Sequence, residues 1–148
     1  DHHRVSYAEY HGRVSRLASG LKARGINPGD VVATLIPNLP AQAEAHFGVP
    51  ACGAVLNTIN TRLDLDTVTY IFEHGGAKAV LVDTQFLELA EAAAAAQTTP
   101  PLIVEVPDAS AGFPLQWLEP HLDDADAWRN RRVLQGHNGQ DDLRCFGR

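Results

Sequence analysis

The chain has 148 residues, of which 45% are hydrophobic and 20% charged, and its formal net charge is -6 at pH 7. This length and composition are typical of one globular domain and exclude wholesale disorder. The acidic balance, with Lys22 and Lys78 as the only lysines, argues against a nucleic-acid binder, which needs a basic surface. No apolar run approaches the roughly 18 residues of a membrane span.

The cysteines and the N-terminus indicate the cellular setting. Cys52 and Cys145 lie far apart and form no Cys-x-x-Cys pair, so we expect reduced thiols and no metal site built on them. The polar start is unlike a signal peptide, and we expect a cytoplasmic location. Because the chain contains no methionine, even at position 1, we interpret it as a fragment whose start lies upstream.

Helix and strand signals alternate along residues 6–106. Apolar residues at three- and four-residue steps indicate helices, and short β-branched runs between turn residues indicate buried strands. The predicted helices cover residues 6–24, 39–52, 64–74 and 85–96, and the predicted strands cover residues 31–36, 53–58, 79–82 and 102–106. Parallel neighbours need crossover connections, so the alternation predicts an α/β fold, a mostly parallel sheet of about four strands with flanking helices.

Local signals mark several helix ends. Ser6 followed by Glu9 is a capping box at the start of the first helix. Pro50 predicts a kink or an early stop in the second helix. Gly75 and Gly76 follow a helix, which indicates a helix stop rather than half of a dinucleotide-binding loop, because that fingerprint follows a strand.

Beyond residue 106 the pattern fades, and we predict an irregular tail over residues 107–148. Its charged residues include Asp123, Asp124, Asp126, Arg129, Arg131 and Arg132. Arginines offset by aspartates in this way indicate a solvated tail rather than an anion-binding site. The composition of residues 117–148 is also what an out-of-frame end of a coding sequence produces. Reading the encoding DNA in its other frames tests this hypothesis.

Some histidines and a cysteine are candidates for chemistry, but their contexts favour structural roles. His46 and His74 lie on predicted helices without a carboxylate or histidine partner four residues further on. Cys52 is expected to be a small core residue. The N-terminal group of Asp1, His2, His3 and His11 favours a ragged terminus over a metal site.

The loop after the second predicted strand contains the most interesting polar residues, Asn60 and Arg62. Ligands of α/β proteins bind at the carboxyl ends of parallel strands, so both residues could face an active site. We favour a structural hydrogen bond or salt bridge, because loop arginines more often hold backbone carbonyls or carboxylates than substrates.

Three stretches together resemble the opening of acyl-activating enzymes. They are residues 6–33, with Ser6-Tyr7-Ala8-Glu9 and Asn27-Pro28-Gly29-Asp30; residues 37–63, with Pro37-Asn38-Leu39-Pro40 and Asn60-Thr61-Arg62-Leu63; and residues 70–83, with Tyr70-Ile71-Phe72-Glu73-His74 and Val80-Leu81-Val82-Asp83. The resemblance spans residues 6–106 and is to the N-terminal portion of the AMP-dependent synthetase/ligase (adenylate-forming) family. The sequence of the second stretch is more similar to short- and medium-chain fatty-acyl-CoA or aryl-CoA synthetases than to peptide-synthetase adenylation domains or luciferases.

The resemblance implies that residues 1–106 are a partial AMP-binding N-terminal domain of a ligase of fatty acid metabolism. In that family a carboxylate attacks the α-phosphate of ATP, and the thiol of CoA then displaces AMP from the acyl-adenylate, with Mg²⁺ screening phosphate charge. The family's phosphate loop, adenine segment and catalytic lysine have no counterpart in this sequence. We therefore assign no catalytic, cofactor-binding or metal residue and predict that the chain alone is inactive. ATP, Mg, CoA and a carboxylic acid belong to the full-length enzyme.

Two other classes of function stay open for comparison. One is a non-catalytic α/β module that binds a nucleotide or a partner, which tight ATP binding by the chain would favour. The other is a Rossmann oxidoreductase domain, disfavoured because no Gly-x-Gly-x-x-Gly follows a predicted strand. A part-sheet leaves an open edge and an uncovered apolar face, so we expect the chain to be aggregation-prone or marginally stable.

Overall fold

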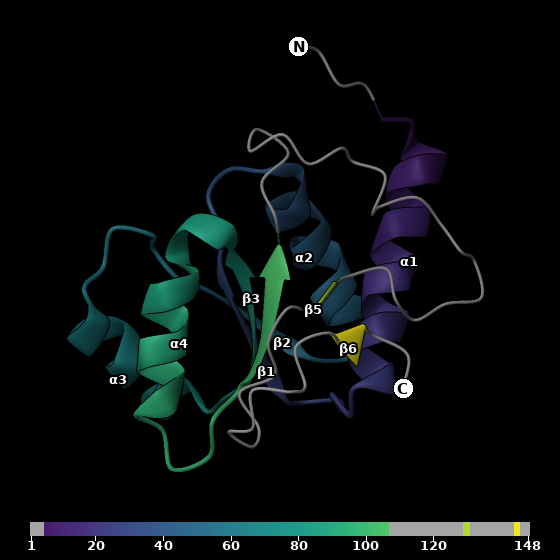
Figure 1. The fold of residues 1–148 in the computed structure, drawn as a ribbon. Coiled ribbons are helices and arrows are strands. Elements are labelled where there is room, and N and C mark those ends of the chain that lie inside the picture. Colours follow the sequence, from purple (N-terminus) through teal and green to yellow (C-terminus); the bar gives the residue numbers. More distant parts are fainter. Residues whose placement is uncertain (1–4, 107–128, 131–143, 146–148) are drawn as a thin grey trace.

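The computed structural model describes residues 5–106 and the backbone of residues 129–130 and 144–145 (Figure 1). Its helices are α1 (Tyr7–Ala23), α2 (Pro40–Ala51), α3 (Leu65–Gly75) and α4 (Leu87–Ala95), with a short 3-10 helix η1 (Thr84–Phe86). The main strands are β1 (Val31–Leu35), β2 (Val55–Thr58), β3 (Ala77–Asp83) and β4 (Leu102–Val106). The predicted irregular tail falls largely outside the described residues. Within it, β5 (Arg129–Asn130) and β6 (Arg144–Cys145) form an antiparallel pair.

Four parallel strands form the main sheet in the order β2-β1-β3-β4. Helices α1 and α2 pack on one face and α3 and α4 on the other, so the sheet is the middle of three layers (Figure 1). This confirms the predicted α/β fold. No helix in the described part of the chain is long and apolar enough to cross a membrane.

Each face of the sheet has its own apolar core. The core under α1 and α2 includes Leu17, Leu21, Val32, Val49, Leu81 and Val104. The core under α3 and α4 includes Leu35, Val68, Phe72, Val80, Val82 and Ile103. All of these side chains are at most 2% exposed. The two helix pairs therefore cover both faces of the sheet over β1, β3 and β4, so the expected uncovered apolar face is absent there, whereas no residue of β2 is buried.

Several element ends differ from the predicted ones. β2 begins at Val55 rather than at residue 53, because Gly53 adopts a φ of +87° and its carbonyl accepts the N–H of Gly29 in a turn. Pro50 does not end α2 early, since the helix runs to Ala51. Because Pro50 lies in the last turn of α2, its missing N–H removes a helical hydrogen bond only in that turn.

Other end signals act as expected. Ser6 Oγ accepts the backbone N–H of Glu9, and the carboxylate of Glu9 accepts the backbone N–H of Ser6, which confirms the capping box. Gly76 ends α3 with a φ of +61°, which confirms the predicted helix stop. The predicted fourth helix starts differently, as a 3-10 turn, because the Asp83 side chain caps that turn rather than α4.

Helices α1 and α2 approach closely at Gly48. A β-carbon added there would lie 2.6 Å from Leu17 Cδ2 and 2.9 Å from Leu17 Cγ, which is below any normal contact distance. Toward the N-terminus of α1, the Tyr10 hydroxyl donates to the carbonyl of Ala43 on α2 at 2.7 Å. The Tyr10 ring packs edge-to-face on Phe47, with ring centroids 5.9 Å apart. The two helices can therefore approach this closely only because Gly48 has no side chain.

We predict that Gly48→Ala lowers the free energy of unfolding by about 1 to 3 kcal/mol, because the added methyl group overpacks a core contact. Urea denaturation followed by circular dichroism measures this. Gly12→Ala on α1 is the matched control, since its nearest contact would be Arg16 Nη1 at 3.5 Å. The control should stabilise the chain by about 0.5 to 1 kcal/mol, as alanine does in a helix interior. Equal stabilities for the two variants would contradict the proposed close approach.

Candidate functional site

The chain leaves β1 and β3 in opposite directions at the carboxyl end of the sheet. After β1, α2 packs on one face and leads outward to β2; after β3, α4 packs on the other face and leads outward to β4. Neighbouring strands with diverging connections form a topological switch point, and ligands of open α/β sheets bind in the crevice there. The topology thus places the candidate site at the carboxyl ends of β1 and β3.

Buried polar residues gather toward this end. In the described part of the chain they are Thr34, Glu44, Asp83 and Glu105, each at most 1% exposed. Thr34 and Glu105 are next to last in β1 and β4, Asp83 ends β3, and Glu44 lies in the first half of α2. None of these residues was predicted from the sequence as part of a site. For Asp83 and Glu105 the available signal was a charged residue at the end of, or within, an apolar strand run.

The two carboxylates at the strand ends shape the turn after β3. Asp83 Oδ1 accepts the backbone N–H of Gln85 at 3.0 Å, and Glu105 Oε1 accepts the hydroxyl of Thr84 at 2.8 Å. Both bonds involve η1, so each carboxylate helps to fix the connection to α4. These two acceptor oxygens therefore have structural roles.

Two buried oxygens at the switch point have no hydrogen-bond partner within the described residues. They are Thr34 Oγ1 and Asp83 Oδ2. The register pairs Thr34 with Leu81 and Leu35 with Val82, and side chains alternate along a strand, so Thr34 and Asp83 both face the α1 and α2 layer. Because a buried polar atom without a partner costs free energy, this is the place where the scaffold can accept a further polar group.

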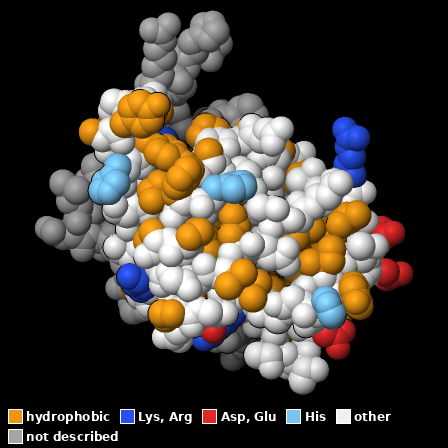
Figure 2. Space-filling view, turned by 180° about the vertical axis from the view of Figure 1, so that it is seen from behind, with side chains coloured by type: hydrophobic (Ala, Val, Ile, Leu, Met, Phe, Trp, Pro, Cys, Tyr) orange, Lys and Arg blue, Asp and Glu red, His pale blue; other side chains and the backbone are white. Residues whose placement is uncertain are grey.

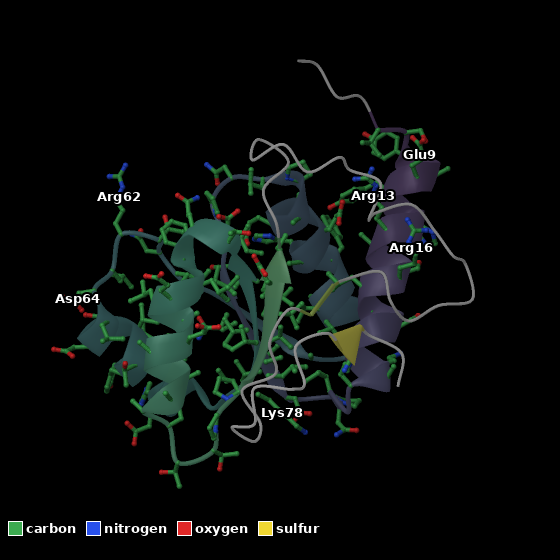
Figure 3. All side chains as sticks on the ribbon, in the orientation of Figure 1. Glu9, Arg13, Arg16, Arg62, Asp64 and Lys78 are labelled. Atoms are coloured by element: carbon green, nitrogen blue, oxygen red, sulfur yellow. The ribbon has the colours of Figure 1, made fainter. Side chains whose placement is uncertain are left out.

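A buried ion pair connects α1 to α2 near the same end. Arg13 Nη1 donates to Glu44 Oε1 at 3.2 Å, with the two side chains 14% and 2% exposed, and Arg13 projects from α1 (Figure 3). Burial raises the pKa of the Glu44 carboxyl, and the nearby Arg13 and Arg16 charges lower it by less. The pKa of Tyr10 is also raised, first by burial and second by the Glu44 charge.

Asn60 and Arg62 lie in the loop after β2, apart from the switch point. Asn60 Oδ1 accepts the backbone N–H of Arg62 at 3.0 Å, which closes a local turn. The Arg62 side chain is exposed and points away from the molecule (Figure 3). Its guanidinium makes no hydrogen bond or ion pair within the described residues. The favoured structural hydrogen bond is therefore made by the backbone of Arg62 and not by its charge.

The other candidate residues lie in separate places. His46 Nδ1 is 2.7 Å from the carbonyl of Gln42, and the His74 ring stacks on Tyr70 with centroids 5.3 Å apart. Cys52 is 2% exposed, and its thiol donates to a backbone carbonyl at 3.0 Å. His11 is exposed on α1. Within the described residues, no three metal-ligating side chains come together.

Some candidates fall outside the described part of the chain. These are Asp1, His2, His3, Asp123, Asp124, Asp126, Arg131, Arg132 and the side chain of Arg129.

A separate hollow of about 740 Å³ lies at the amino end of the sheet. Its lining includes Asp30 and Lys78, which form an ion pair at 2.8 Å, together with Glu73 and Gln97. The hydrogen bond from Lys78 is the main cause that lowers the pKa of Asp30. The hollow and the switch point are at opposite ends of the strands. We place the candidate site at the switch point, because the buried polar groups gather toward that end.

Comparison with known proteins gives one consistent family. The family model described as AMP-binding enzyme matches residues 1–143. The chain is similar to the peroxisomal acetate/butyrate–CoA ligase AAE7 of Arabidopsis thaliana, with 48% identity over 86 residues that cover 58% of this chain and 15% of that protein. It is similar to the long-chain-fatty-acid–CoA ligase of Thermus thermophilus, with 47% identity over 90 residues that cover 61% of this chain and 17% of that protein.

Solved structures show the same relationship. The N-terminal domain of FACL13 from Mycobacterium tuberculosis matches with a TM-score of 0.63 and 32% identity, covering 74% of this chain and 28% of that one. A putative long-chain-fatty-acid CoA ligase from Rhodopseudomonas palustris matches with a TM-score of 0.67 and 27% identity, covering 72% and 27%. The chain thus spans less than a third of the length of each of these proteins.

We predict that Arg13→Met lowers the free energy of unfolding by about 3 kcal/mol, because it leaves the Glu44 carboxylate buried without its cation. Chemical denaturation at neutral pH measures this. The double variant Arg13→Met/Glu44→Leu should recover more than half of the loss, since both charges are then absent. A double variant as unstable as Arg13→Met alone would refute the role given to the pair.

The raised pKa of Glu44 predicts a pH dependence of stability. The folded state holds this proton more tightly than the unfolded state, so the contribution of Glu44 to stability falls as pH rises from about 4.3, the ordinary pKa of glutamate, through the folded pKa. Relative to Glu44→Gln, the wild type should therefore lose stability as pH increases across this interval. Urea denaturation at a series of pH values measures the difference, with Glu88→Gln on the exposed side of α4 as control. A difference that grows in the opposite direction would be inconsistent with the assignment.

Proposed function

Because the chain belongs to the AMP-binding enzyme family, we propose that it is the N-terminal portion of an ATP-dependent acyl-CoA synthetase. The observation that carries the proposal is the family match over residues 1–143 together with 48% identity to an acetate/butyrate–CoA ligase. The complete enzyme would activate a carboxylic acid with ATP and transfer the acyl group to CoA. Since the chain spans 15% of that relative, the activity is proposed for the longer protein.

The proposed substrate class is a carboxylic acid without further detail. The relatives are named for acetate or butyrate, trans-cinnamate, long-chain fatty acids and benzoate. These acids share the carboxylate and little else. We also propose a role in fatty acid metabolism and a cytoplasmic location. Several of the relatives, however, carry the word peroxisomal in their names.

In this proposal the described residues supply scaffold rather than chemistry. The carboxyl ends of β1, β3 and β4 and the first turns of α2 and η1 lie on one side of the switch point, and the Arg13–Glu44 pair holds α1 against α2 beside it. We assign no step of the reaction to the described residues. We propose that the chain alone forms no acyl-CoA.

A chimera tests the function. Residues 5–106 of this chain replace the aligned segment of the T. thermophilus long-chain-fatty-acid–CoA ligase, and thioester formation from a fatty acid, ATP and CoA is measured. We expect kcat/KM within about tenfold of the unaltered ligase, equivalent to roughly 1.4 kcal/mol of transition-state stabilisation. The 148-residue chain should give no thioester under the same conditions. A folded chimera without activity would contradict the proposal.

A measurement of ATP binding distinguishes the proposed function from the alternative of a non-catalytic binding module. Calorimetric titration of the 148-residue chain with ATP and Mg²⁺ should detect no binding tighter than about 1 mM, equivalent to roughly 4 kcal/mol. Micromolar binding by the chain alone would favour the module.

A further inference from the structure

The hollow at the amino end of the main sheet combines apolar and polar lining. Ile26 and Phe72 are buried and Leu102 is half-buried, so the deeper part of the lining is apolar. Glu73 and Thr99 are exposed and contribute polar groups at the rim. The volume of about 740 Å³ lies within the range of small-molecule pockets, roughly 300 to 1,000 Å³. The hollow can therefore hold a small organic molecule that has both an apolar and a polar part.

Three helices end at this hollow. Helices that connect parallel strands run back along the sheet, so their carboxyl ends lie beside the amino ends of the strands. The lining includes Arg24 and Gly76, the C-cap residues of α1 and α3, and Gln97, the second residue after α4. The carbonyl groups of a last helical turn have no intrahelical partner, and each helix end carries a partial charge of about -0.5. The helix ends therefore make the electrostatic potential in the hollow negative.

The charged side chains of the rim do not offset this potential. In the described part of the chain, the charged lining residues are Arg24, Lys78, Asp30 and Glu73, so their formal charges sum to zero. Charged side chains of both signs lie along the lower margin of the molecule in Figure 2, the end at which Figure 3 labels Lys78. Lys78 Nζ donates to Asp30 Oδ2 at 2.8 Å, and the last turn of α4 contains no basic residue. The hollow therefore favours a positively charged group.

The hydrogen-bonding groups around the hollow include several acceptors. Gln97 Nε2 donates to the carbonyls of Thr69 and Ala93, both at 3.1 Å. Both bonds use the amide nitrogen of Gln97, so its amide oxygen is the atom that can accept a further bond. An ammonium group has three donors and no acceptor, which matches the amide oxygen, the Glu73 carboxylate and the carbonyls of the helix ends.

We propose that this hollow binds a small amphiphilic amine, with a primary ammonium group on an aliphatic body. The ammonium group lies at the rim, near Glu73 and the carboxyl ends of α3 and α4, and the aliphatic body contacts Ile26, Phe72 and Leu102. The helix-end charges disfavour a carboxylate on the same body. The hollow and the switch point are at opposite ends of the strands, so this inference goes beyond the proposed function and does not depend on it.

Titration with three six-carbon probes tests the site. n-Hexylammonium, hexan-1-ol and hexanoate share a hydrocarbon body and differ in the charge of the head group. Each probe is titrated into the 148-residue chain, and the amide chemical shifts of Gly76, Lys78 and Gln97 are followed by NMR. We expect hexylammonium to bind at least about tenfold more tightly than hexanoate, equivalent to roughly 1.4 kcal/mol, with hexan-1-ol in between.

A charge variant locates the ammonium group. Thr99→Lys places a cation at an exposed position of the rim, and it should weaken hexylammonium binding at least about fivefold by like-charge repulsion. Tyr7→Lys is the matched control, because it adds the same charge at the opposite end of α1, at a residue 94% exposed. The control should leave the affinity unchanged. Both positions are exposed, so neither substitution disturbs the core.

Several outcomes would overturn the proposal. They are equal affinities for the three probes, tighter binding of hexanoate than of hexylammonium, and chemical-shift changes confined to residues outside the hollow. The same titration of the T. thermophilus chimera that contains residues 5–106 is the second measurement, and it decides the result if the isolated chain aggregates. A chimera that binds hexylammonium but forms no acyl-CoA would count against the proposed function alone.

Discussion

Every connection within the main sheet is a helical crossover, because parallel neighbours cannot be joined by a short turn. This constraint decides most of the architecture. The crossover after β1 places α2 on one face, and those after β2 and β3 place α3 and α4 on the other. It also creates the switch point between β1 and β3 and leaves β2 at an edge. The position of the candidate site follows from these connections.

Some buried polar atoms make hydrogen bonds or ion pairs that stabilise the scaffold, and others have no partner within the described residues. Carboxylates of Asp83 and Glu105 fix the turn into α4, and Glu44 pairs with Arg13 between two helices. Thr34 Oγ1 and Asp83 Oδ2, by contrast, have no partner within the described residues. Since burying such atoms costs free energy, their position at the switch point is consistent with a scaffold that meets further polar groups there.

The family match and the architecture are both consistent with the proposal that the described residues are scaffold for a site in a longer protein. This sequence spans 15% and 17% of two curated relatives, which are several times longer.

Local chemistry in the sequence determined which elements form and where most of them end. The alternation of apolar periods predicted the parallel sheet with flanking helices, and Ser6, Glu9 and Gly76 marked ends that the structure confirms. These signals were readable because capping and turn chemistry act over a few residues. The sequence did not reveal the strand order, the Arg13–Glu44 pair or the polar group at the switch point. Such features depend on contacts between residues far apart in the chain, and only the packed tertiary structure decides them.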